Sequence, residues 1–171
     1  FENLRVAGVR YADLRGYAYD RADVSARALA NAYAQTLGTV FTTESKPLEV
    51  ELVVAEVGAT PEADQIYRLS YDGSVADEHG TVVMGGQAEH LAERLTAEWR
   101  PGMPLAEAVQ LAVRVLGTQP DGEDRTLEPA QLEVAVLDRT RPRRAFRRLA
   151  PAQLADLLGT TAEPSGGPEQ G

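Results

Sequence analysis

Apolar residues recur at every third or fourth position in the first part of the chain, which is the spacing of one face of a helix. This spacing predicts a helix over residues 4–17 and a second over residues 22–37, capped at its N-terminal end by Asp20. Gly38 suits the left-handed position that follows a helix. Small residues occupy every fourth position of the second helix: Ala22, Ala26, Ala30 and Ala34. Such a ridge lets another helix approach closely, so the two helices are expected to pack together.

The pattern then changes to alternating apolar and polar residues, the period of a strand with one buried face. Runs of this kind cover residues 48–54, 66–71 and 81–84. The dipeptide Asp72-Gly73 is a strong hairpin signal between the second and third runs. We therefore expect a three-stranded antiparallel meander.

Helical spacing returns after Gly85-Gly86 and predicts helices over residues 91–99 and 104–117. Pro104 suits the first position of the second of these helices, and Gly117 closes it. Two strands and a last helix follow, at residues 132–136, 145–149 and 151–158. Helix pairs that alternate with groups of antiparallel strands indicate an α+β fold.

The two ends of the chain stand apart from this pattern. Residues 159–171 have nothing to bury and are expected to be disordered. The first helical pattern begins at once after Phe1, without a capping residue, so we expect the natural protein to be longer.

Composition then narrows the class of protein. A chain of 171 residues is expected to form one domain. The absence of cysteine excludes thiolate nucleophiles and cysteine metal sites, and no apolar run approaches the roughly 18 residues that span a bilayer. A net charge of −9 argues against nucleic acid as the main partner, because phosphate binding needs an excess of basic residues.

Residues that could carry catalysis do not form a recognisable constellation. His79 and His90 lie in different predicted elements, and Glu89 and Glu93 near His90 do not complete an HExxH metal motif. The serines lack a neighbouring histidine base, no GxSxG or phosphate-binding glycine loop is present, and the acidic run at residues 121–124 does not alternate ligands as a calcium loop does. We therefore expect no catalytic, cofactor or metal site.

Basic residues are concentrated in one place. The cluster comprises Arg139, Arg141, Arg143, Arg144, Arg147 and Arg148. It is read as a hairpin whose turn and edges carry the charges while Ala145, Phe146 and Leu149 pack inward, although an acidic partner or nucleic acid remains an alternative. Lys46, the only lysine, has carboxylates around it and is read as a loop residue rather than a catalytic amine.

Four stretches of the chain resemble the proteasome α subunits of actinobacteria, in the same order. The first is ENLRVAGVRYADLRGYAYDRADVSARALANAYAQTLGTVFTTESKPLEVELVVAEVG, over both helices and the first strand. The second is QIYRLSYDGSVADEHGTVVMGG, around the hairpin. The last two are LAERLTAEWRPGMPLAEAVQLAVRVL and LEVAVLDRTRPRRAFRRLAPAQLADLL.

The resemblance implies a fold. It is the four-layer αββα sandwich of N-terminal-nucleophile hydrolases, over residues 1–158 and without the first strands and the N-terminal helix. In that family the entry gate and the lysine of the activator pocket belong to the missing portion, so neither is assigned to a residue of this chain.

The resemblance also implies a function. Family α subunits are non-catalytic, because the proteolytic threonine belongs to the β subunits. Seven α subunits form a cytoplasmic ring that templates the β rings, restricts entry of tagged, unfolded substrates and docks a hexameric AAA-type ATPase activator. The helices over residues 4–17 and 22–37 look like those that dock the α ring on the β ring.

We expect subunit contacts at aromatic and small residues of the first two helices, because aromatics are enriched in such interfaces. The candidates are Tyr11, Tyr17, Tyr19, Ala26 and Ala30, with the alanine ridge exposed on the second helix. Three alternatives stay open: a catalytic β-type threonine peptidase subunit, an α+β binding module without a ring, and a nucleic-acid-binding protein.

Overall fold

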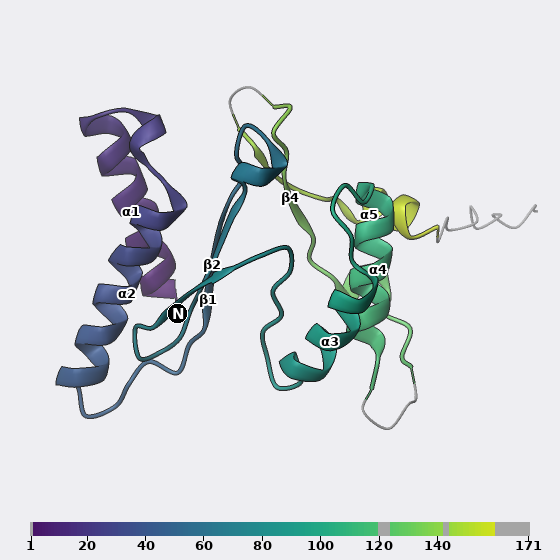
Figure 1. Cartoon of the computed structure of the whole chain (residues 1–171), viewed down its shortest axis with the longest axis horizontal. Coiled ribbons are helices and arrows are strands. Elements are labelled where there is room, and N and C mark those ends of the chain that lie inside the picture. Colours follow the sequence, from purple (N-terminus) through teal and green to yellow (C-terminus); the bar gives the residue numbers. More distant parts are fainter. Residues whose placement is uncertain (1, 120–123, 142–143, 160–171) are drawn as a thin grey trace, which may run out of the picture. The chain divides into compact units, whose positions relative to one another are not determined.

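The computed structural model describes residues 2–119, 124–141 and 144–159 (Figure 1). These residues fall into two compact units. One unit contains the chain up to Met84 together with Leu137–Ala145, and the other contains Gly85–Val136 and the chain from Phe146 onward. Each unit is described by itself, and the single-domain prediction over residues 1–158 stays a prediction.

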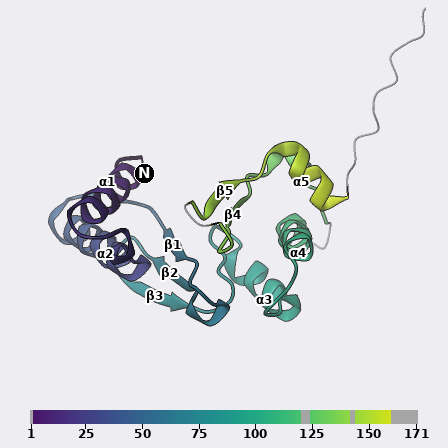
Figure 2. The same cartoon turned by 90° about the horizontal axis from the view of Figure 1, so that it is seen from above.

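The first unit is a helix layer on a three-stranded antiparallel sheet. The helices are α1 (Glu2–Ala18) and α2 (Ala26–Thr43), joined by the 3-10 turn η1 (Arg21–Asp23). The strands are β1 (Leu52–Glu56), β2 (Gln65–Leu69) and β3 (Val75–Glu78), in the spatial order β1-β2-β3, with the 3-10 turn η2 (Pro61–Ala63) between the first two. Figure 2 shows both helices on the same side of this sheet. The predicted helix pair and meander are therefore confirmed.

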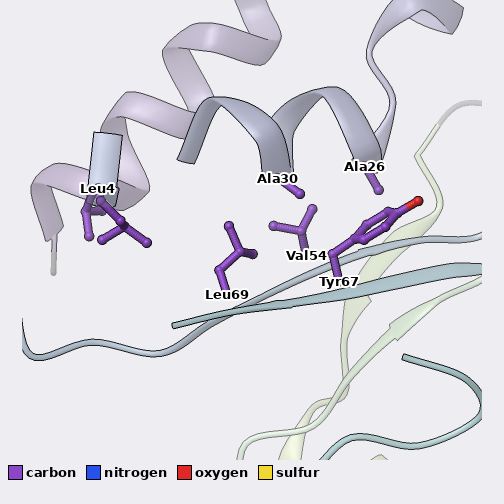
Figure 3. Packing of buried hydrophobic residues seen from close by; sticks show 7 residues of the cluster. Leu4, Ala26, Ala30, Val54, Tyr67 and Leu69 are labelled. Atoms are coloured by element: carbon purple, nitrogen blue, oxygen red, sulfur yellow. The ribbon is translucent and has the colours of Figure 1, made fainter. Parts of the chain in front are cut away.

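The core of the first unit lies between α2 and the sheet (Figure 3). Ala26 and Ala30 point from α2 toward Val54, Tyr67 and Leu69 on the strands. Alternation along β1 and β2 supplies this face, because every second side chain of a strand points to the same side. The Glu56 side chain, also on this face, accepts a 2.6 Å hydrogen bond from the Ala26 backbone N–H at the start of α2.

The start and end of α2 differ from the prediction. Asp20 accepts a hydrogen bond from the Ala22 N–H and thereby caps η1, whereas Ser25 caps α2 by accepting from the Ala28 N–H. Gly38 lies inside α2, which continues to Thr43, and does not have a positive φ. The loop of the following hairpin passes over Gly38, so this glycine serves close packing rather than helix termination.

The predicted strand positions are partly wrong. The third strand is β3 at Val75–Glu78, and residues 81–84 do not form a strand. The turn at Asp72-Gly73 is tight, with Ser70 N–H donating to the Ser74 carbonyl, so the register that pairs Leu69 with Val75 starts directly after it. The apolar run at residues 81–84 was the stronger hydrophobic signal, but the hairpin geometry selects the more polar segment. Strand β1 likewise begins at Leu52, because residues 48–51 have no strand partner in the described chain.

The second unit packs three helices. They are α3 (Ala88–Glu98), α4 (Leu105–Gly117) and α5 (Pro151–Leu158), with the 3-10 turn η3 (Pro129–Gln131) against α5. Their buried residues are Leu91, Val109, Leu111, Val115 and Leu154. Pro104 is the N-cap of α4 rather than its first helical residue, and Gly117 is its last helical residue. Gly159 ends α5 in the left-handed conformation.

Strands β4 (Ala135–Leu137) and β5 (Phe146–Arg148) pair as a two-stranded sheet. Leu149, next to β5, is buried as predicted, but Phe146 is 45% exposed. The prediction that Phe146 packs inward is therefore wrong. Phe146 and Arg148 lie on the same side of β5, and both are exposed. The order of helices and strands agrees with the prediction and the mixed content is α+β. The four-layer sandwich and the disordered tail stay predictions, the latter because residues 160–171 lie outside the described ones.

Candidate interaction site

The outer face of α1 carries apolar side chains that nothing in the described chain covers. Leu4 and Gly8 face inward and are buried. On the remaining surface of the helix, exposed large apolar residues stand among the polar ones: Val6, Val9, Leu14 and Tyr17. The outer side of α1 is therefore a mixed apolar and charged surface, a composition that is common in contacts between proteins.

The predicted interface tyrosines differ in exposure. Tyr17 is 93% exposed and Tyr19 is also exposed, whereas Tyr11 is half-buried. The Arg15 guanidinium lies 5.4 Å from the centre of the Tyr19 ring, a cation–π contact between two exposed side chains. Tyr17 and Tyr19 therefore are accessible to a partner, and their role in an interface stays a prediction.

The alanine ridge of α2 was predicted to be exposed, but Ala26 and Ala30 are buried. Ala26 is 6% and Ala30 is 1% exposed, because both lie against the sheet in the core of the first unit. The every-fourth-residue spacing correctly indicated close packing, but the packing partner is the sheet of the same chain. These two alanines are therefore core residues of the first unit.

A notch of about 540 Å³ adjoins the exposed face of α1. Its lining comes from α1 and η1 and consists of Ala12, Asp13, Gly16, Tyr17, Arg21 and Val24. Because Gly16 has no side chain, the notch reaches the segment that follows η1. Tyr17 therefore stands at the edge of a hollow on the outer surface of α1 and η1.

A second hollow is a groove of about 580 Å³, which we call the acidic groove. It is lined by Pro47, Glu49, Val50, Glu51, Ser70 and Tyr71. The Tyr71 ring stands edge-on to Phe41 at the end of α2, with 5.7 Å between ring centres. The sequence pattern did not single out this groove, because its residues had been read as a strand and a hairpin end.

The arginines of the basic cluster are largely engaged within the chain. The Arg139 guanidinium contacts Asp64 Oδ2 at 2.7 Å and donates to the Gly58 carbonyl at 2.6 Å. Arg148 lies 3.5 Å from Glu133, and Arg141 and Arg147 also have interactions within the chain. Residue 143 lies outside the described residues. These contacts agree with a structural reading of the cluster.

Catalytic chemistry finds little support in the described residues. His79 and His90 lie in separate segments, and His90 Nε2 is buried without a hydrogen-bond partner. No group of three or more His, Asp or Glu in the described ranges is placed to bind a metal ion. Lys46 is exposed in the loop after α2, and the serine hydroxyl of Ser25 is used as a helix cap. None of the helices in the described part of the chain is long and apolar enough to cross a membrane.

Comparison with known proteins identifies the family. Residues 7–137 match the family described as proteasome subunit. The chain belongs to the proteasome subunit family. A protein of Sanguibacter keddieii named proteasome subunit alpha is 71% identical over 167 residues, which cover 97% of this chain and 66% of the relative. A protein of the same name from Xylanimonas cellulosilytica is 73% identical over 166 residues, 93% of this chain and 68% of the relative.

This proteasome-family chain spans about two thirds of the length of the relatives it matches. The match to the family includes most of α1 together with α2 and the three-stranded sheet, the elements that carry the exposed apolar side chains, the notch and the acidic groove. The surfaces described above therefore lie almost entirely in the part of the chain that matches the family.

Proposed function

We propose that this chain acts as a non-catalytic α subunit of the proteasome core particle. The observation that carries the proposal is the set of exposed apolar side chains on the outer side of α1, because contacts with neighbouring subunits would cover them. The high identity to proteins named proteasome subunit alpha supports the same assignment. The chain would then form the four-layer sandwich of that family.

In this role seven copies form a ring, and the ring stacks on a ring of β subunits. The outer face of α1, with Tyr17 beside its notch, is the surface proposed to dock on the β ring. The ring narrows the entrance to the chamber, so that unfolded, tagged proteins pass and folded ones do not, and a hexameric ATPase docks on its outer side. A narrow entrance selects unfolded substrates by their width alone, so this subunit needs no reactive group and no cofactor for its role in the cytoplasm.

The docking proposal is tested on the full-length protein produced together with a proteasome β subunit. Tyr17→Glu and Val6→Glu change exposed positions, so the subunit should fold as before. Native mass spectrometry should show rings of the variant without stacked β rings. Thr96→Glu, an exposed position of α3, is the matched control and should leave the stacked particle intact. Full assembly of both α1 variants would contradict the proposed docking surface.

The catalytic β-type alternative is tested on the same protein without its partner. Purified protein should not cleave fluorogenic peptides, and a threonine-directed inhibitor such as a peptide epoxyketone should add no mass to it. A covalent adduct on this chain would overturn the non-catalytic assignment and favour the alternative.

A further inference from the structure

Four exposed residues form a row along the outer face of α1, which we call the α1 row. They are Val6, Arg10, Asp13 and Tyr17, at intervals of four, three and four residues. Residues at such intervals lie on the same side of a helix. An exposed apolar side chain stands at each end of the row, and one cation and one anion stand at its centre. Reading the row backwards therefore keeps its spacing and exchanges only the two charges.

The two central charges of the α1 row have no partner in the described part of the chain. The side chains of Arg10 and Asp13 are exposed and form no hydrogen bond or ion pair with other described residues. Arg5, on the same helix, is by contrast held by Glu2. The row thus presents an available guanidinium and an available carboxylate between two apolar side chains.

Two copies of the α1 row match each other when the helices run antiparallel. If Val6 of one copy lies opposite Tyr17 of the second, Arg10 lies opposite Asp13, because the intervals are the same from both ends. The contact has two-fold symmetry, so each of these pairings occurs twice. Parallel helices in register would instead place Arg10 against Arg10. The charges therefore select the antiparallel arrangement.

The notch beside Tyr17 offers room for one more side chain of the second copy. Val9 and Gly16 are seven residues apart, about two helical turns, and therefore lie on the same flank of α1. A two-fold axis brings this flank of one helix against the same flank of the other. Val9, which is 50% exposed, then comes level with the notch of the second copy, between Asp13 and Tyr17. An exposed apolar side chain and a hollow to receive it thus occur on the same surface.

We propose that the outer face of α1 binds the same face of a second copy, antiparallel and about a two-fold axis, until a β subunit replaces that copy. The pairing goes beyond the proposed function, and only the replacement by the β subunit rests on it. One helix from each copy makes a small contact, so the pairing is weak and reversible. It keeps the exposed apolar side chains of α1 away from water before the ring stacks.

The symmetry of the contact identifies a second copy as the occupant. The same residues stand on both sides of the contact, so it cannot form within one chain. All of them belong to α1, which lies in the first unit. Helices form the outer layers of the proposed four-layer sandwich, so the outer face of α1 stays accessible in the complete subunit.

Disulfide trapping tests the register, because these 171 residues contain no cysteine. Full-length Val6→Cys and Tyr17→Cys proteins, mixed under mild oxidation without a β subunit, should give a linked dimer on a non-reducing gel. Each variant alone should stay unlinked, because the two copies of one position lie about 16 Å apart along the helices. The parent protein under the same oxidation is the blank. An unlinked mixture, or equal linkage of Val6→Cys alone, would overturn the proposal.

Charge exchange within one chain tests the central ion pairs. Arg10→Asp or Asp13→Arg alone puts like charges together twice and should weaken the pairing about tenfold or more, as measured by sedimentation equilibrium. The combination Arg10→Asp with Asp13→Arg only exchanges the charges and should restore the pairing. Glu93→Arg, an exposed position of α3, is the control and should have no effect. A combined variant as weak as the single ones would contradict the antiparallel contact.

The linked dimer separates this inference from the proposed function. Val6→Cys linked to Tyr17→Cys should not stack on β subunits until a reductant releases it, and stacking of the linked form would refute the shared surface. If the parent protein stacks on β subunits but never pairs, the pairing is wrong and the proposed function stands. If the parent protein pairs but never stacks on β subunits, the pairing stands and the proposed function fails.

Discussion

At the scale of single residues, a close approach between α1 and α2 depends on Gly8. A side-chain carbon built at Gly8 would lie 1.8 Å from the Tyr33 hydroxyl oxygen. That hydroxyl donates a 2.9 Å hydrogen bond to the Leu4 carbonyl, and this bond holds the Tyr33 side chain in place. The two helices can therefore lie close only because this position lacks a side chain.

We predict opposite effects for the same substitution at two glycines of α1. Gly8→Ala should lower the free energy of unfolding by about 1–2 kcal/mol, because overpacking outweighs the gain in helix propensity. Gly16→Ala is the matched control, since its new carbon would lie no closer than 3.6 Å to another atom. It should raise stability by up to about 1 kcal/mol. Urea denaturation measures both, and equal effects would contradict the close approach.

A second residue-scale prediction concerns the turn at Asp72. Hydrogen bonds from the Ser74 backbone N–H and then from its hydroxyl lower the pKa of the Asp72 carboxyl. Because the folded pKa is the lower one, the contribution of Asp72 to stability is present above the pKa of the unfolded chain. It is lost as the pH falls through the folded pKa. Ser74→Ala should raise the Asp72 pKa part of the way back, as measured by NMR titration, whereas Ser70→Ala should leave it unchanged.

At the scale of elements, the β2–β3 hairpin is fitted to α2 at its turn. Gly73 has φ of +86°, and a side-chain carbon there would lie 2.6 Å from the Ala34 carbonyl oxygen and 2.8 Å from the Gly38 nitrogen. The backbone of the turn thus lies directly against the backbone of the helix. This contact explains why α2 contains a glycine at position 38 without ending there.

Gly73→Ala should therefore destabilise the first unit by about 2–4 kcal/mol, the sum of left-handed strain and a clash with backbone atoms. Gly102→Ala provides the control. Gly102 also has a positive φ, +76°, but a new carbon there meets nothing within 4 Å. It should cost only about 1–2 kcal/mol. Chemical denaturation followed by circular dichroism compares them, and an equal loss would show that the α2 contact is not needed.

At the scale of the whole molecule, Arg139 ties together segments that are far apart in sequence. Its guanidinium contacts Asp64 and the Gly58 carbonyl, and Asp64 in turn accepts from the Gly58 N–H at 2.8 Å. Because both charged side chains are about two-thirds buried, this pair should contribute more than the exposed ion pairs elsewhere on the surface.

We predict that Arg139→Ala lowers the free energy of unfolding by about 1 kcal/mol, and that Arg139→Lys recovers only part of it, because an ammonium cannot make the same forked contact. Arg100→Ala is the matched control. It breaks the exposed Arg100–Glu107 pair and should cost less than about 0.5 kcal/mol. Thermal and urea unfolding measure the stability loss of each variant. Added salt should reduce the loss caused by Arg139→Ala far less than the loss caused by Arg100→Ala.

The local sequence pattern was sufficient to predict many of the helices and turns of this molecule. The repeat of apolar residues predicted all five helices. The tight turn at Asp72-Gly73 followed from backbone preferences that depend on a few neighbouring residues, whereas the left-handed conformation expected for Gly38 was wrong.

The tertiary structure was needed to show which segments contact one another. Spacing marked Ala26 and Ala30 as a packing ridge but could not say that the sheet of the same chain covers it. Hydrophobicity favoured residues 81–84 as a strand, whereas pairing across the turn selected Val75–Glu78. The exposed side of α1, the acidic groove and the Arg139 contacts likewise arise from segments far apart in the sequence. A periodic pattern reports which side of an element is apolar, but burial and pairing depend on which neighbour the folded chain brings to that side.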